Sequence, residues 1–184
     1  MSRILTHTGK SFDVLAPQVD MIDPRDISHA LAHLCRWNGH TRVFYSVAQH
    51  SCMVADLVPP EFKLAALLHD GTEAYIGDLP RPIKRAMPEY QRMEHALWLC
   101  IREAFDLPAA MNIGLPDLIK HADRVALATE VRDLLPPDTA ISEALSHIEP
   151  LAERIRPWSA TEARLTFHQR LMDQLAIEHR RKAA

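Results

Sequence analysis

Apolar residues along most of the chain recur at every third or fourth position, which is the spacing of a helix with one buried face. This spacing predicts helices over about 46–58, 61–69, 88–105, 116–135 and 159–181, with a shorter helical piece near 141–148. Prolines stand mostly between these segments, as expected for helices that are joined by short connections.

The N-terminal part adds one more helix and a hairpin. Asp23 is a good N-cap and Pro24 suits the first helical position, so a helix is expected to begin there and to end at Asn38-Gly39. The segment "PRPIKRAM" predicts a loop with a short turn of helix. Within residues 1–15, two short apolar–polar alternations flank Thr8-Gly9-Lys10 and predict a hairpin. The pattern therefore predicts an all-α fold, a single helical bundle with a small N-terminal β-hairpin.

The length of 184 residues suits one domain with a substantial core, and we expect residues 1–184 to form a single domain. The net charge of −3 gives no electrostatic reason to expect a nucleic acid polymer or an anionic membrane as a partner. No apolar run approaches the roughly 20 residues of a membrane span, and the opening "MSRILTHTGK" lacks the apolar core of a signal peptide. The three cysteines show no CxxC spacing. A cytoplasmic protein is expected.

The stretch "LLHDGTEAYIGDLPRPIK", residues 67–84, places ionisable side chains directly after an apolar segment. If the helix continued past Gly71, His69, Asp70 and Glu73 would share one face, because residues three and four apart are neighbours on a helix. Buried carboxylates are unfavourable without a compensating charge. A divalent cation supplies that charge, although an isolated His-Asp pair is common by chance and is more often a surface or capping pair.

His50 and Asp123 further support the prediction of a metal site. His50 lies on the apolar stripe of the preceding predicted helix, and Asp123 lies on the apolar face of the 116–135 helix together with Glu130. His50, His69, Asp70 and Asp123 would form a nitrogen and oxygen site without thiolates, which suits one divalent Mn, Fe, Co, Ni or Zn ion better than a structural zinc site. Glu130 is either an acceptor that orients a ligand or the partner of a buried ion pair.

The order His … His-Asp … Asp resembles the HD-domain metal-dependent phosphohydrolases. The strings "DISHALAHLCRWNGHTR", "FYSVAQHS", "ALLHDGTEAYIGDLPRPIK" and "HADRVALATE" are most similar to the small 5′-deoxynucleotidase-type branch, and the resemblance covers about residues 1–135. It places the ligand-bearing core over about 24–135, with the C-terminal helix at 159–181 outside it. One position departs from the pattern, because relatives often have Glu before the first ligand and this chain has Gln49.

The resemblance implies a role for each matched residue. His50, His69, Asp70 and Asp123 would be the metal ligands. Glu73 would activate or orient the attacking water, and Asp78 would be the second catalytic carboxylate, near the leaving oxygen. The pair Arg36 and Trp37 would contact phosphate and nucleoside, and Lys84 would lie near the phosphate.

The leading hypothesis is a metal-dependent phosphohydrolase that removes the phosphate from 2′-deoxynucleoside 5′-monophosphates, with a nucleotide as its small-molecule partner. One alternative is a dNTP triphosphohydrolase or pyrophosphohydrolase that uses the same site. A rival from another class is a nucleotide- or metal-sensing module without turnover, against which the presence of both Glu73 and Asp78 argues. Proteins of this branch are often dimeric, so a homodimer is kept open beside a monomer.

Overall fold

The computed structural model describes residues 3–137 and 139–183. The chain folds into helices with one two-stranded antiparallel hairpin, β1 (Arg3–Leu5) and β2 (Ser11–Asp13). The helices are α1 (Pro24–His33), α2 (Val47–Asp56), α3 (Lys63–Leu67), α4 (Glu73–Ile76), α5 (Arg81–Ala86), α6 (Pro88–Ala104), α7 (Asp117–Leu134), α8 (Thr139–Ala144) and α9 (Ala160–Ala183). Short 3₁₀ turns lie at Val19–Met21, Arg36–Gly39, Pro60–Phe62 and Ala109–Asn112. The predicted all-α bundle with an N-terminal hairpin is confirmed.

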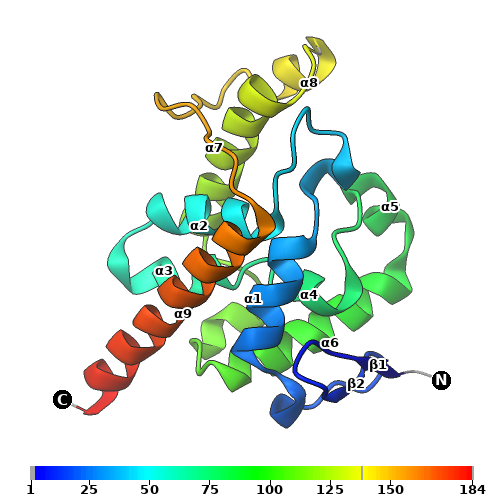
Figure 1. Ribbon diagram of the computed structural model, residues 1–184, viewed down its shortest axis with the longest axis vertical. Coiled ribbons are helices and arrows are strands. Elements are labelled where there is room, and N and C mark those ends of the chain that lie inside the picture. The colour runs from blue at the N-terminus through cyan, green and yellow to red at the C-terminus, as the bar shows by residue number, and fades with distance from the viewer. Residues whose placement is uncertain (1–2, 138, 184) are drawn as a thin grey trace.

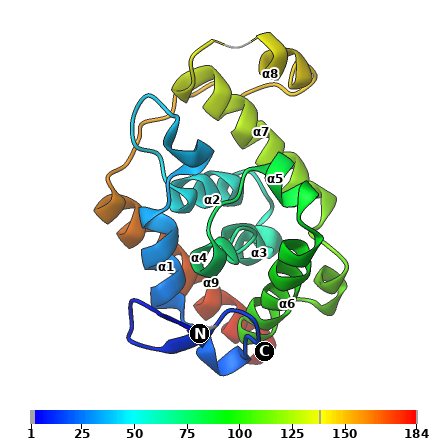
Figure 2. The same cartoon turned by 90° about the vertical axis from the view of Figure 1, so that its right-hand side faces the viewer.

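Helices α2 and α3 lie in the middle of the molecule, α8 lies at one end, and the hairpin lies at the other end (Figures 1 and 2). The C-terminal helix α9 packs against α1, α2 and α3. The central helices are almost entirely buried, and α2 buries the polar residues Gln49, His50 and Ser51 among its apolar ones. Within residues 3–137 and 139–183, no helix combines the length and the apolar character that crossing a bilayer would require.

Local sequence signals fix several helix ends. The Asp23 side chain accepts a hydrogen bond from the backbone N–H of Arg25 at 2.9 Å, and Ser46 Oγ accepts one from the N–H of Gln49 at 3.2 Å. Both are N-cap bonds that satisfy a free helical N–H. The hairpin turn contains Gly9 at φ 83°, a conformation that glycine adopts without steric cost. Met1 and Ser2 of the predicted hairpin segment lie outside the described residues.

The helix predicted to reach 58 ends at Asp56, and the piece predicted near 141–148 is Thr139–Ala144. Two further differences in helix ends bear on the site. The first helix ends at His33 and not at Asn38-Gly39, because Leu34 turns extended and Cys35 pairs with Ser46 as a β-bridge. The helix predicted to reach His69 ends at Leu67. The chain then makes a tight turn in which the N–H of Gly71 donates to the carbonyl of Leu68 at 2.8 Å.

Candidate metal centre

The predicted ligands from α2, the turn after α3, and α7 come together at one place. One ligand atom each from His50, His69 and Asp123 lie within 4.8 Å of one another, so this group is able to hold a metal ion. His50 Nε2 lies 3.2 Å from Asp123 Oδ1. Asp70 lies beside this group, since its Oδ2 is 3.2 Å from His69 Nε2 and 3.6 Å from His50 Nε2.

The hydrogen bonds of the two imidazoles determine which nitrogen faces this cluster. His69 Nδ1 lies 2.7 Å from the carbonyl oxygen of Ala66, which can only accept, so Nδ1 carries the hydrogen. His50 Nδ1 lies 2.7 Å from Glu130 Oε1 and donates in the same way. The Nε2 atoms of both rings are buried and have no hydrogen-bond partner among the described residues. In the neutral rings these are two lone pairs that face two carboxylates, an arrangement that a divalent cation satisfies.

The turn after α3 explains how neighbouring residues reach the same point. Successive residues of a helix point about 100° apart, so His69 and Asp70 would diverge if α3 continued through them. Because α3 ends at Leu67, the backbone rotates and both side chains face His50. Gly71 lies where an added Cβ would be only 2.9 Å from the carbonyl oxygen of Leu68, so a larger residue would disturb the turn.

Glu130 on α7 is fully buried and connects the His50 imidazole to Arg36 and Trp37. Its Oε1 accepts from His50 Nδ1, and its Oε2 accepts from Arg36 Nε at 3.1 Å and from Trp37 Nε1 at 2.9 Å. From the sequence, Glu130 could either orient a ligand or form a buried ion pair. In the structure Glu130 makes both kinds of contact. The signal was its place on the apolar face that also carries Asp123.

Arg36 and Trp37 lie in the 3₁₀ turn that follows α1. The Arg36 side chain is 11% exposed, and its Nη1 lies 3.6 Å from Asp70 Oδ2. Trp37 and Asn38 have φ values of 55° and 51°, a left-handed conformation that is unfavourable for a tryptophan. The bond from Trp37 Nε1 to Glu130 helps to hold this strained backbone.

A pocket of about 600 Å³ opens beside the metal centre, a size typical of small-molecule sites. Its lining includes Arg36, Trp37, Asp70, Glu73, Asp78, Lys84 and Asp123, together with Asn38, His40 and Arg81. Every residue that the sequence proposed for catalysis or substrate binding thus borders this pocket. The side chains of His50 and His69 are not part of its lining.

The two candidate catalytic acids reach the pocket from different backbone segments. Glu73 begins α4, and its Oε2 is buried with no hydrogen-bond partner in the described part of the chain. Asp78 follows Gly77, whose φ of 81° ends α4 and redirects the chain. Tyr90 Oη donates to the Gly77 carbonyl at 3.0 Å and holds this turn. The acids can therefore address different sides of a bound ligand.

The charges around the acids explain their pKa values. Burial, with the carboxylates of Asp70 and Asp78 nearby, holds the pKa of Glu73 well above its usual range. Burial is also the main cause of the raised pKa of Asp78. Burial opposes ionisation of Asp70 as well, but His69, His50 and Arg36 keep the pKa of its carboxyl below the usual value. The pocket therefore contains closely spaced acids in unlike electrostatic settings.

Lys84 borders the pocket but is already paired. Its Nζ donates to Glu94 Oε1 at 2.6 Å and lies 5.8 Å from the ring centre of Tyr90. Glu94 is ten residues away on α6, and sequence reasoning missed this pair because nothing in the local pattern signals it. Arg81 was also missed; its Nη2 lies 4.0 Å from Asp123 Oδ2, and its side chain is 67% exposed.

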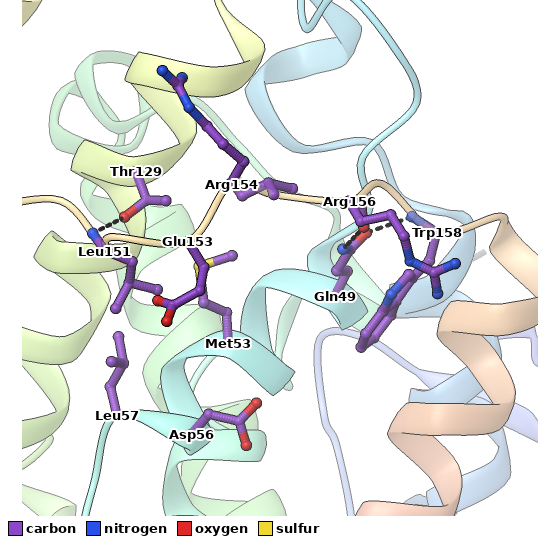
Figure 3. A pocket seen from close by; sticks show the side chains of 11 residues that line it. Gln49, Met53, Asp56, Leu57, Thr129, Leu151, Glu153, Arg154, Arg156 and Trp158 are labelled. Carbon is purple, nitrogen blue, oxygen red and sulfur yellow. Dashed lines mark hydrogen bonds between the residues drawn. The ribbon is translucent and has the colours of Figure 1, made fainter.

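Gln49, the departure from the family pattern, faces away from the metal centre. Its Nε2 donates to the carbonyl of Arg156 and its Oε1 accepts from the N–H of Trp158, both at 2.8 Å. Figure 3 shows these bonds beside a separate pocket of about 360 Å³ between α2, Thr129 and the segment 151–158. Both ends of the amide are used, which explains why glutamine fits here and means that the side chain adds no charge to the ligands.

Comparisons with known proteins give relatives without an assigned activity. The chain is 46% identical over 134 residues to the uncharacterized protein YfdR of Escherichia coli strain K12, and the match covers 73% of this chain and 73% of that protein. It is 31% identical over 181 residues to the uncharacterized protein RCAP_rcc00048 of Rhodobacter capsulatus, with 90% of this chain and 92% of that protein covered. No family model matches the chain.

Proposed function

The chain belongs to the same family as these two uncharacterized proteins, and from the chemistry of its own site we propose that it is a divalent-metal-dependent phosphohydrolase of the HD-domain type. The observation that carries the proposal is the pair of bare imidazole Nε2 atoms, which face Asp70 and Asp123 at the edge of a pocket that also holds acids and cations. We propose that its substrates are nucleotides, foremost 2′-deoxynucleoside 5′-monophosphates.

The residues divide the work of hydrolysis as follows. When bound, a divalent ion would screen the phosphate charge and lower the pKa of the attacking water. Glu73 accepts a proton from that water while the water oxygen forms a bond to phosphorus. Asp78 gives a proton to the 5′ oxygen as the bond between that oxygen and phosphorus breaks. The products are a nucleoside and inorganic phosphate.

Arg36 and Trp37 bind the substrate in this proposal. Arg36 keeps N–H groups free beyond the one that Glu130 accepts, and guanidinium forks suit phosphate oxygens. Trp37 presents an aromatic surface to the pocket for the nucleoside. Lys84 would have to share its ammonium group between Glu94 and the phosphate.

A second candidate is hydrolysis of a deoxynucleoside triphosphate at the same site. It is favoured by Arg81 and His40, which border the pocket beyond Arg36 and Lys84 and would suit additional phosphate groups. A sensing module without turnover would have no use for Glu73 and Asp78 beside the ligands.

One experiment separates these readings. Purified protein is incubated with ribo- and deoxynucleotides at the mono-, di- and triphosphate level, each with Mn, Co, Ni, Zn or Fe(II), and phosphate, pyrophosphate and triphosphate are measured as products. Release of phosphate from deoxynucleoside monophosphates is expected. Pyrophosphate or triphosphate from dNTPs would select the second candidate, and tight nucleotide binding without any product would favour the sensor.

A further inference from the structure

A second polar pocket, with none of its lining residues in the pocket beside the metal centre, lies between the hairpin, α1 and α9. It has a volume of about 400 Å³ and is lined by His7, Thr8, Arg25, Ser28, Arg164 and His168. These residues come from the first 28 positions and from the C-terminal helix, so the fold alone brings them together. We propose that this pocket binds the phosphoryl group of a small phosphorylated metabolite.

The first support is a cation that lacks a counter-ion. Arg164 has no hydrogen-bond or ion-pair partner among the described residues, and neither Asp nor Glu is part of the pocket lining. Arg25 donates from Nε and Nη2 to Asp23, which leaves its other N–H groups available. Guanidinium groups bind tetrahedral oxyanions through parallel charge-assisted hydrogen bonds.

The acid nearest the lining is already satisfied. Asp26 accepts from the backbone N–H of Thr8 at 2.7 Å and from Thr8 Oγ1 at 2.8 Å. These bonds hold the hairpin turn against α1 and direct the carboxylate to Thr8. Asp23 pairs with Arg25, and the carboxylate of Asp26 keeps its charge near Arg25 and His29. Arg164 is therefore the lining cation that has no carboxylate partner among the described residues.

His168 and Ser28 form an oriented pair. Ser28 Oγ donates to the carbonyl of Pro24 at 2.5 Å, so it must accept from His168 Nδ1, which lies 3.0 Å away. The proton on Nδ1 leaves Nε2 as the ring atom without a fixed partner. This atom is therefore available to a phosphoryl group in the pocket.

A column of stacked imidazoles borders the pocket. The rings of His7 and His29 are 3.7 Å apart, and those of His29 and His33 are 4.2 Å apart. Burial, together with His33, His7 and Arg164, lowers the pKa of His29. Its imidazolium form is therefore disfavoured by the neighbouring positive charges. An oxyanion in the adjoining pocket would relieve that repulsion.

The volume indicates that the ligand is more than a free ion. Pockets of about 300–1,000 Å³ are typical for small organic ligands, and a lone phosphate would leave part of this space empty. A phosphate ester with a small organic part fills it better. The organic part would lie toward the hairpin side, where His7 offers an imidazole face.

The test measures anion binding by titration calorimetry on the full-length, metal-loaded protein at constant ionic strength. The probes are inorganic phosphate and glycerol 3-phosphate. The variants are Arg164→Gln and His168→Gln, with Arg180→Gln as a matched control, since it removes the same charge from the same helix about 24 Å further along. Arg36→Ala is included to separate binding in the pocket beside the metal centre.

Anion binding is expected to persist in Arg36→Ala and in Arg180→Gln. In both Arg164→Gln and His168→Gln it is expected to weaken at least about tenfold, the size of effect that a lost charge-assisted hydrogen bond gives. Tighter binding of the ester would identify a phosphorylated metabolite, and equal affinities would limit recognition to the phosphoryl group. Unchanged binding in both pocket variants would overturn the proposal, as would the loss of all anion binding in Arg36→Ala. Circular dichroism on each variant verifies that it is folded.

Discussion

Replacing Glu130 with glutamine tests whether this buried carboxylate positions the metal ligand. The wild-type carboxylate accepts from His50 Nδ1 through one oxygen and from Arg36 and Trp37 through the other. Glutamine has a single oxygen acceptor, so one side must lose its partner. With the amide oxygen toward His50, Arg36 and Trp37 face an NH₂ group. In the opposite orientation the NH₂ group faces His50 Nδ1, and the ring proton must move to Nε2, where it blocks metal binding.

Both orientations predict measurable losses. Each buried donor that is left without a partner costs about 1–3 kcal/mol. For two such donors, a melting temperature lower by roughly 5–15 °C is expected for a chain of this size. Metal affinity should fall about 10- to 100-fold, the usual effect of removing the acceptor behind a ligating histidine.

The assay is a Co²⁺ titration at a temperature where both proteins are folded, followed by the visible absorption of the metal, with melting curves on the same preparations. Nitrogen NMR of the histidine rings reports which ring atom of His50 carries the proton. Glu149→Gln is the control, because Glu149 is exposed and has no partner among the described residues. Metal affinity within about twofold of wild type, with an unchanged histidine spectrum, would refute the positioning role even if the melting temperature fell.

The remaining predictions address the ligand, the base and the supporting segment. Asp70→Ala should retain less than about a tenth of the metal, and chelation of wild-type protein should lower its melting temperature, because the ligands come from separate segments; full metal stoichiometry in Asp70→Ala would remove it from the ligand set. Glu73→Gln should keep its metal while kcat falls by at least about two orders of magnitude, as for loss of a general base, and near-normal turnover would exclude that role. Gln49→Glu sets a carboxylate oxygen against the Arg156 carbonyl, so stability should fall by about 1–3 kcal/mol with metal affinity within about twofold; a large change in affinity at unchanged stability would contradict its orientation.

The long helices could be predicted from the sequence because their signals are local. Periodic apolar residues placed α6, α7 and α9 within about two residues of their observed ends. Asp23 was recognisable as a cap because an N-cap acts within its own first turn. The ends of α1 and α3 were not predictable in this way. The end of α1 depends on the pairing of Cys35 with Ser46. The end of α3 depends on a turn that the apolar run through Leu67 and Leu68 does not predict.

The break after α3 matters most for the site. Sequence reasoning selected His69 and Asp70 on the assumption of a continuous helix, and that assumption is wrong, yet the two residues lie together. A continuous helix would have placed both His69 and Asp70 about one turn before Glu73, with their own side chains about 100° apart. The turn instead brings Asp70 toward both imidazoles and leaves Glu73 at the start of α4, with its side chain on the pocket.

Contacts between distant segments explain how Gln49 and Thr129 are oriented. Gln49 and Thr129 directly precede His50 and Glu130, and consecutive residues of a helix face different directions. Gln49 and Thr129 therefore bind the segment 151–158, Thr129 by accepting from the N–H of Leu151 at 3.0 Å, while His50 and Glu130 bind each other on the metal side. Helices α2 and α7 are thus connected on one side by the hydrogen bond between His50 and Glu130, and on the other side by the segment 151–158. Since a ligating histidine must be held within a few tenths of an ångström to bind well, the segment 151–158 supports the metal centre without touching it.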